Sequence, residues 1–437
     1  MPDAPGRRIP MISKRKGRRN AIQNTAIVLL SVSAVLLFAQ AQLYNLGSSL
    51  FDSGRLTSLF QSGTAVQSAD SPGSLADVAA PVQIVVTGHY GRYGQSGLST
   101  TDGSFSTLGP LLGEALGSAG SVSASDAQSF QSALGTVSVY YDFLQPLPLE
   151  LLAGLTGSSP KTAGLSARSL LLSVEGSGVT LYLWDGNRTY SKCSTYVTSE
   201  NVQEVVGSYE LGNAFFAFEL GAKYTDFAPL CLFINTERTA PVLSASSGPS
   251  DMSALLTVLG FNPHTNNRYT EVSGTEVVME GNSSVRIAAD GTVTYHGGSD
   301  GDLRISTDSG TPALSDAVLG GYRLMLQLLS GQMGDAQLCL QNAAQSGSST
   351  TLQFGLLVDG LPVRFSNDAP AAVVRLSGTT VSGFTLRLRQ YTATTEDSLL
   401  LPLHQAAAIA KEYPGGELTA CYVDAGGSTV SARWLAN

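Results

Sequence analysis

The first 19 residues of the chain hold seven of its 25 Lys and Arg residues, and a long uncharged stretch follows them directly. The basic residues are Arg7, Arg8, Lys14, Arg15, Lys16, Arg18 and Arg19. No charged residue then occurs from Asn20 until Asp52. As a helix, the apolar part 25–43 would be about 28 Å long, close to the roughly 30 Å hydrocarbon core of a bilayer. Because positive charge stays on the cytoplasmic side, the sequence predicts a single-pass protein of the cell membrane, with a cytoplasmic N-terminus and an extracytoplasmic remainder.

A cleaved signal peptide is the alternative interpretation of the same stretch. Ala26 to Phe38 has the length of a signal-peptide apolar region, and Ala39-Gln40-Ala41 fits a cleavage site with small residues. We expect the uncleaved membrane anchor.

One face of the expected membrane helix carries mostly small side chains. Ser31, Ala34, Phe38 and Ala41 share this face, and small or hydroxyl-bearing residues let two helices pack closely in lipid. We therefore expect these four residues to form a helix interaction face. The alternative is that Ser31 and Ser33 only bond back to their own helix.

The rest of the chain is acidic. Outside the seven basic residues and Asp3, it has 18 Lys and Arg against 33 Asp and Glu, a net charge of −15. Such a surface repels nucleic acid and other polyanions, so no nucleic-acid partner is expected.

The four cysteines all lie in this acidic part, where an extracytoplasmic location would permit disulfides. They are Cys193, Cys231, Cys339 and Cys421, and none belongs to a CxxC pair, which argues against zinc. Pairing Cys193 with Cys231 and Cys339 with Cys421 keeps each bond within one expected domain. The other two pairings, and four buried free thiols, stay open.

Composition divides the chain into five expected parts. These are a basic cytoplasmic tail (1–24), a transmembrane helix (25–43), a Ser/Gly-rich stalk (44–79), and two ectodomains (80–240 and 253–437). The boundary between the ectodomains falls in Pro241 to Met252, which contains Ser-Ser-Gly-Pro-Ser.

Apolar periodicity predicts helices and antiparallel hairpins in both ectodomains. In the first, strands are expected at 81–87, 136–143, 170–175, 179–184, 214–220 and 230–234, with helices at 108–116, 146–155 and 201–206. In the second, strands are expected at 275–280, 284–289, 292–295, 337–343, 352–358, 361–365, 372–376 and 381–390, with helices at 253–259, 314–329 and 403–412. The expected fold class is therefore α+β: one N-terminal transmembrane helix, then two domains of antiparallel sheets packed with helices.

No catalytic, cofactor-binding or metal-binding residues are predicted, and no cofactor is expected. The four histidines are widely spaced and form no HExxH motif. Ser158 to Lys161 matches Ser-x-x-Lys formally, but the companion elements of penicillin-binding enzymes are missing. Gly88 to Gly94 satisfies neither the dinucleotide nor the Walker pattern, so it is interpreted as a structural loop.

Several stretches are similar to segments of clostridial-type YycH/YycI proteins. They are Glu114–Ala119, Val139–Phe143 leading to Pro146–Leu149, Leu259–Thr265, Glu280–Asn282, Ala289–Val293 with Tyr295, and the segment from Leu401–Ala408 to Trp434. The resemblance covers most of the ectodomain, its second part being YycI-like, and none of its motifs is catalytic.

This resemblance implies a non-enzymatic, membrane-anchored accessory regulator of the WalK-WalR cell-wall two-component system. Its implied partners are a sensor histidine kinase of the WalK type and a second YycH/YycI-type regulator. The alternative function is an extracytoplasmic module that binds wall polymer or peptide through aromatic side chains such as Tyr90, Tyr93 and Trp184.

Overall fold

The computed structural model of the chain describes residues 75–97, 103–158, 164–219, 227–235, 239–249, 251–298, 303–307, 310–329, 331–401, 403–410 and 416–436. The chain divides into two compact units, 1–63 and 64–437, and all described residues belong to the second. The predicted anchor 25–43, with its face Ser31, Ala34, Phe38 and Ala41, lies outside the described residues, as do the predicted tail 1–24 and most of the stalk 44–79.

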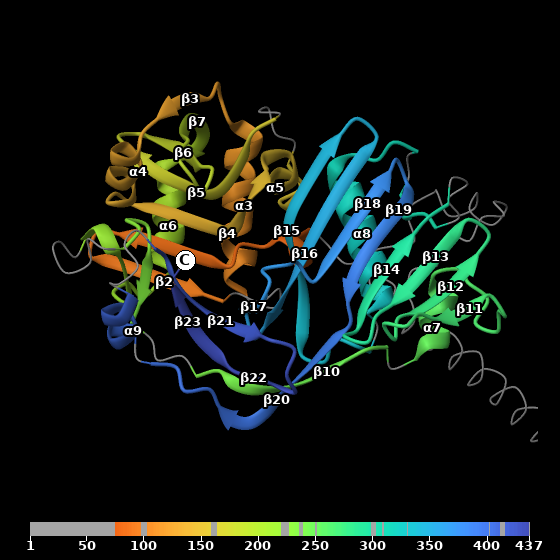
Figure 1. Ribbon diagram of the computed structural model, residues 1–437. Coiled ribbons are helices and arrows are strands. Elements are labelled where there is room, and N and C mark those ends of the chain that lie inside the picture. Colours follow the sequence, from red (N-terminus) through yellow and green to blue (C-terminus); the bar gives the residue numbers. More distant parts are fainter. Residues whose placement is uncertain are drawn as a thin grey trace, which may run out of the picture. The chain divides into compact units, whose positions relative to one another are not determined.

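The first large sheet has seven strands in the order β2-β1-β4-β5-β6-β7-β3, and every neighbouring pair is antiparallel (Figure 1). Its strands are β1 (Gln83–Gly88), β2 (Gly91–Ser96), β3 (Ser123–Ser125), β4 (Ser138–Pro148), β5 (Ser166–Glu175), β6 (Gly178–Trp184) and β7 (Tyr190–Thr198). The central strands β4, β5 and β6 contain runs of buried residues, as expected for strands covered on both faces.

The second large sheet has eleven strands in the order β11-β12-β13-β14-β19-β18-β16-β17-β21-β23, with β15 also paired to β16. Its strands are β11 (Arg268–Thr270), β12 (Glu276–Glu280), β13 (Ser283–Ile287), β14 (Thr292–His296), β15 (Ala336–Ser346), β16 (Ser349–Val358), β17 (Leu361–Phe365), β18 (Ala372–Ser377), β19 (Thr380–Arg387), β21 (Leu418–Asp424) and β23 (Ala432–Ala436). Only β17 and β21 pair in parallel.

Two smaller sheets complete the described strands. One has the order β20-β10-β22, formed by β20 (Arg389–Asp397), β10 (Pro241–Ser247) and β22 (Thr429–Val430). The other pairs β8 (Ala214–Phe216) with β9 (Leu232–Ile234).

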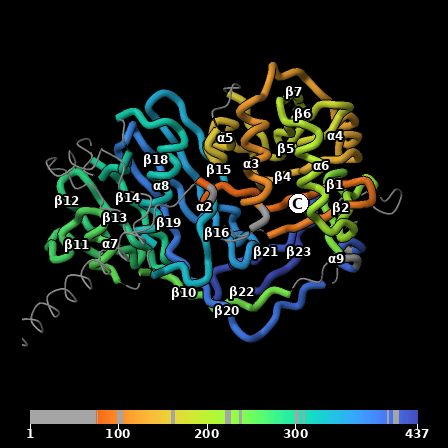
Figure 2. Tube along the Cα trace, turned by 180° about the vertical axis from the view of Figure 1, so that it is seen from behind, coloured from red at the N-terminus to blue at the C-terminus, as the bar shows by residue number. Residues whose placement is uncertain are grey.

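Helices cover the sheets and fill the space where the two large sheets meet (Figures 1 and 2). They are α2 (Leu75–Ala79), α3 (Gly103–Ser118), α4 (Ala127–Leu134), α5 (Leu149–Leu155), α6 (Ser199–Gly207), α7 (Met252–Val258), α8 (Leu314–Leu328) and α9 (Leu403–Ala410). Contacts among α2, α5 and α8 tie the two sheets together, since α5 follows β4 and α8 packs on β15 and β16. The main hydrophobic core is accordingly continuous, from Val139 and Leu170 in the first sheet to Val374 and Leu386 in the second.

The expected α+β class is wrong, because the structure is mostly β, with 47% strand and 22% helix. Strands β2, β7, β10 and β20 lie in stretches rich in Gly, Ser or Thr whose hydrophobic pattern is weak. Hydrogen-bonded pairing with neighbouring strands forms them instead: Ser244 of β10, for example, lies opposite both Thr392 and Thr429. Residues 241–247 thus form a strand inside the predicted domain boundary; the ranges 80–240 and 253–437 stay predictions.

The expectation of a single-pass protein of the cell membrane is also corrected. In the part of the chain that the structure describes, no helix is long and apolar enough to cross a bilayer. Its longest helices, α3 and α8, have 16 and 15 residues. At about 1.5 Å per residue they fall short of the roughly 30 Å that a spanning helix needs.

A buried ion pair joins the small β20-β10-β22 sheet to the second large sheet. Arg389 Nε and Nη2 donate to the two carboxylate oxygens of Asp424, at 2.7 and 2.8 Å, and Tyr391 Oη donates to the same carboxylate at 2.6 Å. Burial alone would raise the pKa of Asp424, but hydrogen bonds from Arg389, Tyr391 and the Gly426 N–H hold this pKa below its usual value of 3.8. Asp424 is 2% exposed, so its ionised form depends on these donors.

Replacing Asp424 by Asn should lower the free energy of unfolding by about 3–5 kcal/mol at pH 7, because Arg389 would keep a buried charge without its counter-charge. The pKa of Asp424 is lower in the folded than in the unfolded protein. The ionised carboxylate therefore adds to the free energy of unfolding above the unfolded pKa, and this contribution is lost as the pH falls through the folded pKa. Urea unfolding of both proteins at pH 7 and pH 3 should therefore show a smaller difference at pH 3. Asp316→Asn, at an exposed position in α8, is the matched control. Equal stability of D424N and the parent protein at pH 7 would contradict this account.

Candidate functional site: the cleft between the two large sheets

Strand β4 departs from its neighbour β5 at the junction of the two large sheets. The register shifts between Asp142, which lies opposite Ser169, and Leu147, which lies opposite Ala167. Leu144 in this bulge has φ of 65°, and its N–H donates to Asp142 Oδ1 at 2.8 Å. A non-glycine residue with positive φ is uncommon, and here the Asp142 carboxylate holds the turn. The bulge carries 143–146 away from β5 and toward β15, which contacts β4.

A guanidinium between two carboxylates, called here the Arg168 clamp, connects the sheets beside this bulge. Arg168 of β5 donates from Nε to Asp142 Oδ1 (3.2 Å) and from Nη2 to Asp142 Oδ2 (3.3 Å). It also donates from Nη1 and Nη2 to Glu417 Oε1 and Oε2, at 2.9 and 2.7 Å. Glu417 directly precedes β21 of the second large sheet. The Arg168 clamp is therefore an ion pair with one carboxylate on each side of the junction.

Burial and stacking limit the freedom of Arg168. The Arg168 and Asp142 side chains are 15% and 6% exposed, and the guanidinium carbon lies 5.3 Å from the ring centre of Trp184. Burial by itself would lower the pKa of Arg168, but the carboxylates of Asp142 and Glu417 raise it above its usual value. Arg168 is thus a fixed charge whose donors already bind protein carboxylates.

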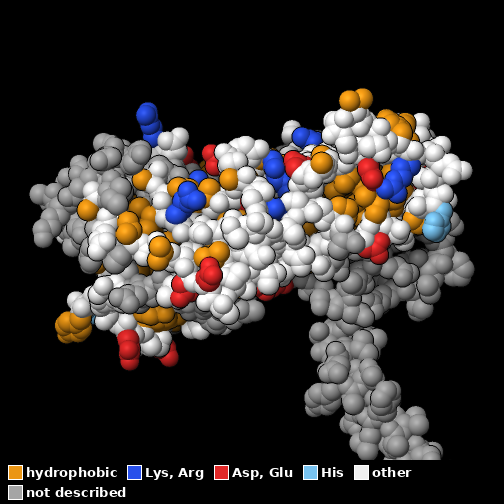
Figure 3. Space-filling view, turned by 60° about the horizontal axis from the view of Figure 1, so that its bottom comes forward, with side chains coloured by type: hydrophobic (Ala, Val, Ile, Leu, Met, Phe, Trp, Pro, Cys, Tyr) orange, Lys and Arg blue, Asp and Glu red, His pale blue; other side chains and the backbone are white. Residues whose placement is uncertain are grey.

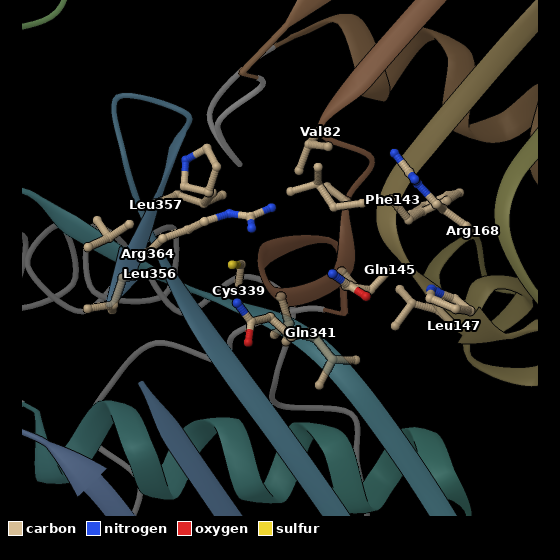
Figure 4. A pocket seen from close by; sticks show the side chains of 18 of the residues that line it. Val82, Phe143, Gln145, Leu147, Arg168, Cys339, Gln341, Leu356, Leu357 and Arg364 are labelled. Carbon is tan, nitrogen blue, oxygen red and sulfur yellow. The ribbon is translucent and has the colours of Figure 1, made fainter. Parts of the chain in front are cut away.

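A cavity of about 620 Å³, called here the clamp cavity, opens between β4 and the strands β15, β16 and β17. Its walls combine apolar side chains such as Val82, Phe143 and Leu357 with polar ones. In Figure 4, Arg364 extends across the cavity from one wall, Gln145 lies on the opposite wall, and Cys339 and Gln341 lie between these walls and below Arg364. The remaining polar residues lining it are Asp77, Arg168, Asp185, Asn187, Gln337, Asp368, Glu417 and Thr419.

A second hollow, of about 820 Å³, adjoins the clamp cavity and is called here the edge groove. The two share Val82, Leu144, Pro362 and Thr419, so they are parts of one cleft. The edge groove is lined by β2, by β21 and β23, and by Ser398, Leu400 and Leu401. The remainder comes from Val82, Gln83 and Leu144, from 213–239 and from the β16–β17 turn.

The β16–β17 turn fixes the distance between the sheets at this cleft. Asp359 and Gly360 have φ of 49° and 66°, the conformation of a two-residue hairpin turn that glycine favours. A Cβ placed on Gly360 would lie 1.7 Å from the carbonyl oxygen of Gly97, at the end of β2. Any side chain at Gly360 would therefore force the turn away from β2.

The described residues include no group of three or more His, Cys, Asp and Glu placed to hold a metal ion. The charged groups of the Arg168 clamp bind one another. Asp185 accepts hydrogen bonds from the N–H groups of Asn187 and Thr189 in its own turn, at 2.8 and 3.0 Å. The residues that line the cleft can take part in hydrogen bonds, ion pairs and apolar contacts.

The four cysteines carry free thiols, and none is bonded to another. Cys193, Cys231 and Cys421 are buried and Cys339 is partly buried, in the wall of the clamp cavity. Burial raises the pKa of all four thiols, to about 11 for Cys231 and Cys421 and to about 12 for Cys339.

The aromatic residues named for the alternative wall-polymer function do not form a common platform. Tyr90 is 96% exposed, whereas Trp184 is 7% exposed and lies beneath Arg168. Tyr93 packs on Tyr209, with ring centres 5.1 Å apart, and its hydroxyl donates to Gln95. Gly88 to Gly94 includes the β1–β2 hairpin turn.

The sequence reasoning missed the Arg168 clamp. Asp142 was the one available signal for it. This residue is the single charge inside the strand-like run Val139–Phe143, and a charge in a buried strand needs a partner of opposite charge. Glu417 could not be connected to it, since it lies 249 positions from Arg168.

Comparisons with protein-family models, with curated proteins and with solved structures found no significant match for this chain.

Replacing Arg168 by Met should lower the free energy of unfolding by about 3–5 kcal/mol, because Asp142 would remain buried without a counter-charge. The double variant Arg168→Met with Asp142→Asn should recover part of this loss. Chemical denaturation measures both, and Arg188→Met, at an exposed turn position, should change stability by less than about 0.5 kcal/mol. If R168M and R188M have the same stability, the Arg168 clamp does not hold the sheets.

Thiol titration distinguishes free cysteines from disulfides. Without reductant, the denatured chain should react with Ellman's reagent at four thiols. The native protein should react much more slowly at pH 8, since burial and raised pKa values suppress the thiolate. Prior reduction provides the control, because it yields four thiols in either case; fewer than four in the unreduced denatured sample would show a disulfide.

Proposed function

We propose that this chain is a non-enzymatic regulator that binds a segment of a partner protein in the clamp cavity. The observation that carries the proposal is a cavity of about 620 Å³ between two sheets, beside a buried ion pair to which both sides contribute. Sites that bind ligands are typically concave, with volumes of about 300–1,000 Å³ and a few polar groups among apolar walls.

The wall chemistry of the cavity supports binding rather than catalysis. A catalytic acid or base needs a group that is available to exchange a proton with substrate. Arg168, Glu417 and Asp185, three of the six charged residues in the lining, instead make hydrogen bonds inside the protein, and Arg168 stays protonated. Gln145 and Gln341 carry neutral amides, which donate and accept hydrogen bonds as a peptide backbone requires.

The sequence resemblance adds a candidate partner, the outer part of a sensor histidine kinase of the WalK type. Binding would alter the kinase only through different affinities for its signalling states, which shifts the population between them. Because the cavity belongs to both sides of the junction, a bound segment would contact both large sheets at once.

The test fills the cavity without disturbing the core. Gln145 and Gln337 are exposed residues in the cavity wall, so Gln145→Trp combined with Gln337→Trp should block the cavity while the protein still folds. Binding of the full-length chain to the purified outer part of the kinase would be measured by biolayer interferometry. We expect this variant to weaken binding by about tenfold or more, a loss of roughly 1.4 kcal/mol.

Gln203→Trp is the matched control, since Gln203 is exposed on α6 and does not line the cavity. It should bind like the parent protein, and circular dichroism should show that all three proteins are folded. Equal binding by the cavity variant, or no binding of the kinase by the parent protein, would refute the proposal.

A further inference from the structure

The edge groove differs from the clamp cavity in that it has no charged lining. None of the described residues that line it is Asp, Glu, Lys, Arg or His. Its lining consists of apolar side chains, among them Leu232, Ile234, Leu361, Leu400 and Trp434, together with small residues, amides and hydroxyls. The whole chain has a net charge of −9, so an uncharged hollow of about 820 Å³ is a distinct chemical environment.

Strands at the ends of both large sheets reach this groove. β2 is the first strand in the order of the seven-stranded sheet, and β23 is the last in that of the eleven-stranded sheet. The edge of β2 is covered at Gly94, whose N–H and C=O both bond to the Asn213 side chain, at 2.7 and 3.0 Å. The edge of β23 is likewise bonded by a side chain at one residue, Ala432.

The segment Ser398–Leu401, rather than another strand of the sheet, borders β23 at Ala432. The Ala432 N–H donates to Ser398 Oγ at 2.9 Å, so the peptide groups of Ala432 point away from β21. Because alternate residues of a strand point their peptide groups to the same side, those of Trp434 also face this edge. Trp434 Nε1 donates to the Leu401 carbonyl oxygen at 2.9 Å, which places the indole beside the segment Ser398–Leu401.

The rim of the groove exposes one leucine of its lining on this segment. Leu401 is 41% exposed, and Leu399, which lies outside the lining, is 98% exposed. Covering a leucine side chain is worth about 1.5–3 kcal/mol, so this rim favours an apolar occupant. Figure 3 shows hydrophobic side chains reaching one face of the molecule in separate groups, with acidic and basic side chains between them.

We propose that the edge groove binds an extended, uncharged peptide segment with apolar side chains, supplied by another protein and laid along β23. Among the described lining residues, a charged side chain would lose hydration without gaining a counter-charge, which favours an uncharged segment. An extended backbone can bond to the outward-facing peptide groups at Trp434, as peptides do when they add to a sheet edge. This inference concerns a different surface from the clamp cavity and does not rest on the kinase as partner.

The experiment selects peptides from a displayed library of random ten-residue sequences against the full-length protein. The selected peptides should be depleted in Asp, Glu, Lys and Arg and should contain apolar residues at alternate positions. Leu401→Asp, which puts a charge on the rim at a part-exposed position, should weaken their binding by about tenfold or more. Val272→Asp is the matched control, because Val272 is fully exposed and lies outside the groove; it should leave binding unchanged within about twofold.

Fluorescence locates the bound peptide. The chain has two tryptophans, so Trp184→Phe leaves Trp434 as the only indole. Peptide binding to this variant should shift the Trp434 emission to the blue as solvent leaves the groove. The inference is overturned if the library yields no binder, if the selected peptides are charged, if they bind L401D as tightly as the parent protein, or if they bind without changing the Trp434 emission.

Discussion

The burial of one guanidinium between two carboxylates is the constraint on which the cleft depends. Arg168 binds Asp142 within the seven-stranded sheet and Glu417 at the start of β21 in the eleven-stranded sheet. Two buried charges of opposite sign are stable together, but neither tolerates the loss of its partner. The same Asp142 carboxylate also accepts the hydrogen bond from the Leu144 N–H, so the ion pair and the β4 bulge depend on one side chain. The walls of the clamp cavity are thus positioned by electrostatics and backbone geometry, while the continuous core supplies most of the stabilisation.

The two hollows of the cleft offer different chemistry within one framework. The clamp cavity combines guanidinium, carboxylate and amide groups with apolar walls, whereas the described lining of the edge groove is uncharged. A partner protein that used both would place a polar segment in one and an apolar extended segment in the other. The shared residues Val82, Leu144, Pro362 and Thr419 bring these two segments close together. The different chemistry of the two hollows would make binding specific for a partner with both kinds of segment. A segment suited to one hollow leaves unpaired polar groups or uncovered apolar surface in the other.

Elements with a strong local pattern could be predicted from the sequence, and those formed by strand pairing could not. The strand 361–365 coincides with β17, and the helix 314–329 differs from α8 by one residue, because both have a clear apolar periodicity. The residues of β10 lie in the predicted domain boundary 241–252, because their Ser-rich sequence becomes a strand only beside β20 and β22. The cleft was not predictable for the same reason: Arg168 and Glu417 are distant in sequence, and only tertiary pairing brings them together.

Hydrogen exchange of the full-length protein, with and without the outer part of the proposed partner, a sensor kinase, tests most directly whether the cleft is a binding site. Backbone amides exchange through local opening, so a segment held in the clamp cavity should slow exchange in the strands that form its walls. The account predicts added protection at Phe143–Pro148 of β4 and at Ala336–Ser346 of β15, with β11 and β12 unchanged. Binding that leaves both wall segments unprotected, or that protects only strands outside the cleft, would contradict it.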